Sequence, residues 1–179
     1  MTEKLKSLRS TTSKAALGTA LGVAFGLALS GFPRRVGLTR AQALVSMPGD
    51  LILPMAEVQA DRSATFDANP DQVWPFTGEL VSMYADLWDV PLRVEYQEEG
   101  QLVALVTDFE SIDQIPANQY YQASLALRMV SSAPGTCTLQ VRERYQTAGL
   151  RSAVAVWGSI VSSNTTFRRW TRSVRRALR

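Results

Sequence analysis

The sequence predicts an α+β fold in which a curved antiparallel sheet wraps around one long C-terminal helix. Alternation of apolar and polar residues predicts strands at 58–67, 92–97, 102–109, 120–131 and 136–147. Helical spacing predicts two helices, at 71–87 and 151–178, and the second contains no proline. Because the apolar face of such a sheet has to be covered, we expect the last helix to lie on it, with a cavity between the two.

The N-terminal region contains a run of eighteen uncharged residues, Ala15 to Phe32, which follows the basic segment 1–14. This length is just sufficient to cross a bilayer, so the sequence predicts a single-pass transmembrane helix at 15–32. Small residues recur at every fourth position and fall on one stripe of that helix. Such a stripe lets a partner transmembrane helix, or the same helix in a homodimer, approach closely. Its members are Gly18, Gly22, Gly26 and Ser30.

Two alternatives to a retained membrane anchor remain open. The basic leader, the apolar run and the small residues Ala28-Leu29-Ser30 also fit a cleaved secretory signal peptide. The run also fits a helix buried in a soluble core. Basic residues flank it on both sides, so the positive-inside rule leaves the side of the membrane open. The three arginines that follow the run favour the cytoplasmic face.

Residues 33–57 are expected to form a connector, because Pro33, Pro48, Gly49 and Pro54 interrupt them. The domain itself is expected at 58–179. Its first helix is expected to hold Pro75 in the first turn, where proline is tolerated.

The charge is unevenly distributed, and the composition excludes several kinds of active site. Residues 58–150 have a balance of −8, whereas residues 151–179 contain seven arginines and no acid. The chain contains no histidine, which removes the usual general base, the histidine triads and most zinc sites. We therefore expect no metal and no cofactor, and an enzyme is the least favoured class.

Three short motifs resemble those of bacterial START-like proteins (SRPBCC, polyketide cyclase/dehydrase-like). They are Ser46-Met47-Pro48-Gly49-Asp50, Ala64-Thr65-Phe66-Asp67-Ala68-Asn69-Pro70 and Val73-Trp74-Pro75. Gly37-Leu38-Thr39 is similar to the same region in membrane-anchored members. The resemblance implies a helix-grip fold whose cavity binds a hydrophobic or lipid-like small molecule.

Strand parity suggests which strand residues line that cavity, because alternate residues of a strand share one face, and helical spacing places Trp157 and Asn164 at the edge of the apolar face of the last helix. The candidate ligand-pocket residues are Tyr121, Leu125, Met129, Glu143, Tyr145, Trp157 and Asn164. A carboxylate on the inner face must be paired, protonated or at the cavity mouth. Glu143 is therefore expected either to pair with Arg62 or to bind a ligand headgroup. We expect Glu143→Ala to destabilise the domain more than Arg142→Ala, because it leaves Arg62 unpaired.

Six arginines share one side of the C-terminal helix, within an arc of roughly 120°. They are Arg168, Arg169, Arg172, Arg175, Arg176 and Arg179. They either solvate an exposed face or bind anionic lipid headgroups or an acidic partner. Nucleic acid is not an expected partner, because the sheet region is acidic and no binding motif is present.

The sequence leaves three functions open. The first is a membrane-anchored domain that binds a hydrophobic ligand. The second is a non-catalytic accessory subunit of a larger membrane complex, docked through its glycine-striped helix. The third is a cyclase-like enzyme.

The protein is expected to stay in the membrane fraction through a high-salt wash and a carbonate wash, because an uncharged run of eighteen residues partitions into the bilayer. Immunoblotting of the pellet and supernatant measures this. A mature chain that begins at Gly31 would contradict it.

Overall fold

The computed structural model describes residues 34–111, 121–147 and 149–179. The predicted transmembrane helix at 15–32, with Gly18, Gly22, Gly26 and Ser30, lies outside these ranges. None of the helices in the described ranges combines the length and the apolar character needed to cross a membrane.

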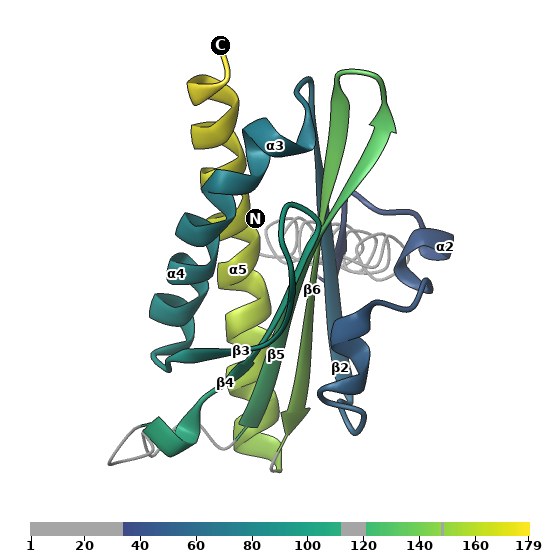
Figure 1. The fold of residues 1–179 in the computed structure, drawn as a ribbon. Coiled ribbons are helices and arrows are strands. Elements are labelled where there is room, and N and C mark those ends of the chain that lie inside the picture. Colours follow the sequence, from purple (N-terminus) through teal and green to yellow (C-terminus); the bar gives the residue numbers. More distant parts are fainter. Residues whose placement is uncertain (1–33, 112–120, 148) are drawn as a thin grey trace, which may run out of the picture. The chain divides into compact units, whose positions relative to one another are not determined.

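A six-stranded sheet in the order β1-β2-β6-β5-β4-β3 forms the centre of the domain, and α4 and α5 lie on one side of it (Figure 1). Neighbouring strands are antiparallel except β1 and β2, which are parallel. The predicted α+β fold, with a sheet wrapped on a C-terminal helix, is confirmed. The elements are β1 (Arg35–Val36), α2 (Arg40–Ala43), η1 (Pro48–Leu51), β2 (Val58–Phe66), α3 (Pro70–Val73), η2 (Trp74–Phe76), α4 (Thr77–Trp88), β3 (Leu92–Glu98), β4 (Leu102–Thr107), η3 (Phe109–Ser111), β5 (Tyr121–Ala133), β6 (Thr136–Thr147) and α5 (Leu150–Ala177).

The long hairpin of β5 and β6 has the predicted strand parity. Leu125 and Leu127 on β5 are fully buried in the core, and so is Leu139 on β6. The turn between the strands contains Gly135, whose φ of 72° is in the left-handed region that glycine adopts without strain. The alternating pattern therefore identified the inner face of the hairpin correctly.

The helix predicted at 71–87 is broken into α3, η2 and α4. Pro75 has no backbone N–H to continue the α-helical hydrogen bonding, so the chain passes through the short 3₁₀ helix η2. The side chain of Thr77 then donates to the carbonyl of Trp74 at 2.7 Å at the start of α4. The prediction of one continuous helix with Pro75 in its first turn is wrong for this reason.

Of the connector predicted at 33–57, Arg35–Val36 form the edge strand β1, and residues 40–57 pack on the side of the sheet opposite α4 and α5 (Figure 1). Met47 in this segment forms a small apolar cluster with Ala104 and Ala126 on the sheet. Gly49 approaches the sheet so closely that an added Cβ would lie 2.7 Å from the Cβ of Ala126. Only glycine fits there, which gives a structural reason for the Pro-Gly-Asp motif.

Arg142 ties this segment to the outer face of β6. Its guanidinium donates to Asp61 and to Asp50, both at 2.7 Å, and to the carbonyls of Ala43 and Val45 at 2.8 and 2.9 Å. The side chain is only 3% exposed. The expectation that Arg142→Ala would matter less than Glu143→Ala is therefore replaced by an expectation of comparable losses.

Arg142→Ala is expected to lower the free energy of unfolding by about 3 kcal/mol, because it leaves the buried carboxylate of Asp61 without its cation. Urea denaturation followed by circular dichroism measures this. Arg93→Ala is the matched control, since it removes an arginine whose ion pairs are at the surface. Equal urea midpoints for Arg142→Ala and Arg93→Ala would contradict the prediction.

Candidate functional site

A cluster of polar side chains occupies the interior between the sheet and the two long helices. We call it the buried polar cluster. All of its members are at most 5% exposed. They are Arg62 on β2, Tyr84 on α4, Glu143 and Tyr145 on β6, and Ser163 and Asn164 on α5.

Arg62 uses its guanidinium to link the sheet to α5. Its Nε donates to Oδ1 of Asn164 at 2.9 Å, and one Nη donates to the carboxylate of Glu143. The other Nη donates to Oγ of Ser163 at 2.7 Å and to the carbonyl of Ile160 at 2.9 Å. The predicted pair of Arg62 and Glu143 is confirmed, and it is fully buried.

The carboxylate of Glu143 accepts hydrogen bonds from four side chains. Besides Arg62, the hydroxyl of Tyr84 donates to Oε1, while Tyr145 and Ser163 donate to Oε2 at 2.6 and 3.1 Å. The donors come from both sheet and helices, so the carboxylate joins β2, β6, α4 and α5. A buried charge is tolerated only with such a complete set of partners.

The electrostatics of the cluster keep both phenols protonated. Burial raises the pKa of Tyr84 and of Tyr145 well above the usual value, and the negative charge of Glu143 raises it further. Burial alone would lower the pKa of Arg62, but the charge of Glu143, together with smaller contributions from Tyr84, Tyr145 and Asp61, outweighs it, so that pKa is raised. The two tyrosines therefore act as hydrogen-bond donors and the arginine as a fixed cation.

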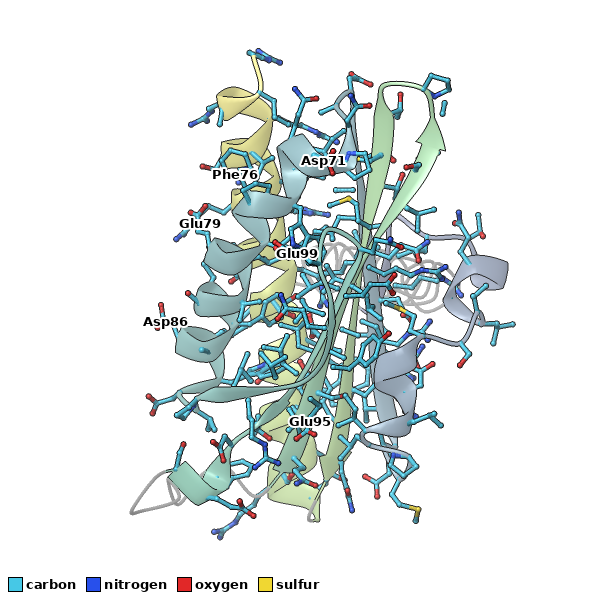
Figure 2. All side chains as sticks on the ribbon, viewed as in Figure 1. Asp71, Phe76, Glu79, Asp86, Glu95 and Glu99 are labelled. Carbon is cyan, nitrogen blue, oxygen red and sulfur yellow. The ribbon has the colours of Figure 1, made fainter. Side chains whose placement is uncertain are left out.

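Aromatic and aliphatic side chains fill the space around the cluster, as the sticks between the sheet and the helices show (Figure 2). Trp88 packs edge-on against Tyr84 and Tyr145, with ring centroids 5.5 and 5.7 Å apart. Trp88, Leu125 and Ile160 are at most 1% exposed. Among the described residues, the protein's own side chains thus occupy the space around the buried polar cluster, where the sequence predicts a ligand cavity.

The structure divides the predicted ligand-pocket residues among several places. Leu125, Glu143, Tyr145 and Asn164 all lie in the interior. Trp157, in contrast, is 43% exposed on the outward face of α5. The side chain of Tyr121 lies outside what the structure describes.

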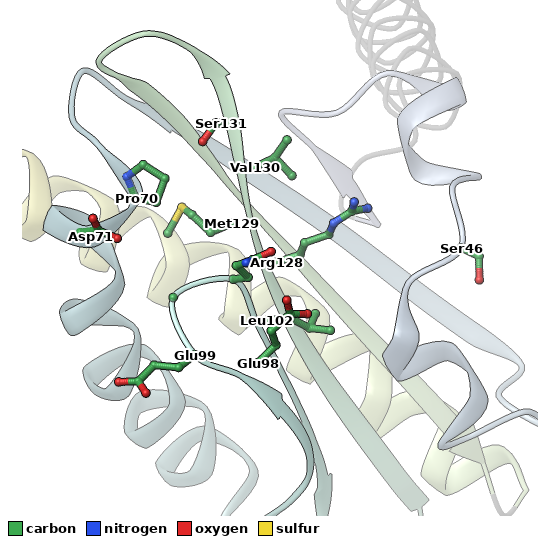
Figure 3. Close-up of a pocket in the computed structure, with 12 residues that line it drawn as sticks. Ser46, Pro70, Asp71, Glu98, Glu99, Leu102, Arg128, Met129, Val130 and Ser131 are labelled. Atoms are coloured by element: carbon green, nitrogen blue, oxygen red, sulfur yellow. The ribbon is translucent and has the colours of Figure 1, made fainter.

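Met129, the remaining candidate, lines a pocket of about 710 Å³ at the end of the sheet (Figure 3). Met129 lies on the side of Pro70 and Asp71, whereas Arg128 points to the side of Ser46. The pocket therefore bends around the strand end. Its lining is largely polar and includes Glu99, which does not favour an apolar ligand.

All six arginines predicted on the C-terminal helix are exposed; five of them lie on α5, and Arg179 follows the end of the helix at Ala177. Arg168, Arg172 and Arg175 line a groove of about 630 Å³ between α5 and the β1–β2 edge of the sheet. Arg175 donates to the carbonyl of Thr65 at 3.0 Å and lies 5.8 Å from the ring centre of Phe66. Arg175 therefore helps to hold α5 on the sheet.

Sequence reasoning missed two members of the buried polar cluster, Tyr84 and Ser163. Ser163 and Asn164 interrupt the apolar face of α5 between Ile160 and Phe167. Two adjacent polar residues on an otherwise apolar helix face were the available signal, because buried polar groups need partners on the facing element. Tyr84 gave no such signal, since a tyrosine on an apolar face is an ordinary core residue.

No family model matches the chain, and no curated protein matches it. Among solved structures it is similar to the Zhui aromatase/cyclase from Streptomyces sp. R1128, with 16% identity and a TM-score of 0.40, covering 68% of this chain and 95% of the other. It is also similar to a START superfamily protein from Mycobacterium smegmatis, with 8% identity and a TM-score of 0.39, over 68% and 99% of the two chains. A third is Ara h 8.0201, with 11% identity and a TM-score of 0.46, over 65% and 96%.

The free energy of unfolding is expected to fall as the pH rises above about 10, the usual pKa of tyrosine. Above that value the tyrosines of the unfolded chain ionise, whereas Tyr84 and Tyr145 in the folded domain stay protonated because their pKa is raised. Tyr84→Phe and Tyr145→Phe should each reduce this loss, as measured by urea denaturation at pH 8 to 11. The surface variant Tyr96→Phe is the control. The prediction would be contradicted if the free energy of unfolding changed with pH equally in the wild type and in all three variants.

Proposed function

We propose that the chain is a membrane-tethered, non-catalytic START-like module that serves as an accessory subunit of a larger membrane complex. The observation that carries this proposal is the filled interior, where the buried polar cluster and Trp88 occupy the space between the sheet and the helices. A small-molecule site of the usual kind needs about 300 to 1,000 Å³ in that position. The tether is the uncharged run at 15–32.

The energetics of the cluster support a closed interior. A ligand that entered between β6 and α5 would separate Glu143 from Ser163, and Arg62 from Asn164. Leaving a buried charge without its partners costs about 3 to 5 kcal/mol. This is a large part of the stability of a domain of this size.

The state of the cluster also supports a non-catalytic role. The carboxylate of Glu143 already accepts four hydrogen bonds, and its strongest partner is the cation of Arg62. The phenols of Tyr84 and Tyr145 have a raised pKa and so do not act as bases near neutral pH. A cyclase-like reaction would need a side-chain acid or base that can still form a hydrogen bond with a substrate.

Native mass spectrometry of the full-length protein, released from membranes in mild detergent, tests the closed interior. The expected mass is that of the polypeptide without a stoichiometric hydrophobic molecule. Trp88→Ala, after incubation with indole, is the control for detection, because removal of the indole side chain opens an apolar cavity between Tyr84 and Tyr145. A stoichiometric hydrophobic adduct on the wild-type protein would contradict the proposal.

The second candidate function is binding of a hydrophobic or lipid-like ligand in the interior, and one observation favours it. Val94 on β3 pairs with Leu105, a core residue on the inner face of the sheet, yet Val94 is 50% exposed. The inner face is therefore less covered at β3 than elsewhere, and an apolar ligand would enter there. The same mass measurement separates the candidates, because this one requires the adduct.

A further inference from the structure

The outward face of α5 changes character along its length. Its first turns expose a stripe of apolar side chains at helical spacing, and no charged residue occurs between Arg151 and Arg168. Its last turns expose only arginines and small polar or apolar residues. The exposed apolar side chains are Leu150, Val154, Trp157 and Val161.

The apolar and the basic parts lie on one continuous side of the helix. Trp157 and Arg168 are eleven residues apart, which is about three turns. The 28 residues of α5 extend over about 42 Å, so the face is long enough to make an extended contact. Both parts are exposed among the described residues: Val154 is 66% and Val161 53% exposed, and the arginines of the basic part are exposed as well.

The groove beside the basic part contains cations and no acid. Of the residues that line it, three are arginines and none is aspartate or glutamate. Nε of Arg172 donates to the backbone carbonyl of Arg168, which fixes the direction of that guanidinium along the helix. Two arginines one turn apart present a set of donors that matches the oxygens of a phosphate group.

The groove also adjoins the start of the folded domain. Val36 and Gly37 on and after β1 form part of its lining. The predicted transmembrane helix ends at Phe32, so at most about 14 Å of chain separates it from Val36. A tether that ends at Phe32 would therefore keep Val36 within that length of chain of the bilayer.

We propose that the outward face of α5 lies on an anionic phospholipid surface, with a headgroup phosphate bound in the groove by Arg168 and Arg172. This rests on the proposed tether and names the surface through which the module contacts the membrane. The stripe from Leu150 to Val161 enters the interfacial region beside the headgroups.

A bilayer is the occupant that matches both parts of the face. The apolar stripe needs an apolar environment and the arginines need anions, and the headgroup region supplies both. A nucleic acid would neutralise the arginines but leave Leu150 and Val154 in water. The acidic side chains of Glu79 and Asp86 on α4 point away from the body of the domain (Figure 2), whereas residues 151–179 contain seven arginines and no acid.

The test uses the full-length protein in vesicles of phosphatidylcholine, with and without phosphatidylglycerol, that contain lipids with brominated acyl chains. Bromine quenches tryptophan fluorescence at short range, and Trp157 is the tryptophan on the outward face of α5. We expect quenching that requires phosphatidylglycerol and is lost in Trp157→Phe. Each arginine near the membrane surface contributes about a fivefold factor to binding. The double variant Arg168→Gln with Arg172→Gln should therefore lose most of the quenching.

Arg93→Gln with Arg128→Gln is the matched control, because it removes the same charge from β3 and β5. It should leave the quenching unchanged. Equal quenching in both lipid compositions, or equal loss in the two double variants, would overturn the proposal. Tryptophan quenching reports on the α5 face, whereas native mass spectrometry reports on the interior. Failure of this proposal can therefore be told apart from failure of the proposed closed interior.

Discussion

The buried ion pair of Arg62 and Glu143 is the interaction on which the rest of the domain depends. A lone charge in this position would be very unfavourable, so the pair is stable only when every hydrogen-bond partner is present. Those partners come from β6, α4 and α5, as Tyr145, Tyr84 and Ser163. The pair therefore couples the two helices to the sheet, and we expect the sheet–helix assembly to form and unfold as one unit.

The outer face of the sheet is held by a second set of charges that does not touch the first. Arg142 binds Asp61 on the neighbouring strand and Asp50 in η1, so residues 34–57 are part of the folded unit. Both faces of the sheet are then covered, one by helices and the other by this segment. Among the described residues, the outward side of α5 and the groove beside β1 place exposed apolar side chains next to arginines.

Much of the fold followed from local pattern, and the exceptions have physical reasons. Alternation in β5 and β6 gave the correct inner face, and a carboxylate there required a cation, which pointed to Arg62. The burial of Arg142 was not predictable, because its cover at 43–50 has no periodicity that marks it as packed. Tyr84 joins the cluster through tertiary contact alone, over 59 residues of chain. The break at Pro75 was missed because proline is compatible with both the start of a helix and its interruption.

The order of charges along β6 has a consequence for strand pairing. Glu143 stands between Arg142 and Arg144, and neighbouring residues of a strand face opposite sides of the sheet. If β6 slipped by one residue in either direction, an arginine would take the inward-facing position of Glu143, which pairs with Ala60 and contacts Arg62 diagonally in the interior. Two like charges would then be buried together, while the outer carboxylate of Asp61 would face Glu143 or lose its cation. The alternation of charge thus rejects both neighbouring registers and leaves one alignment of the central strands.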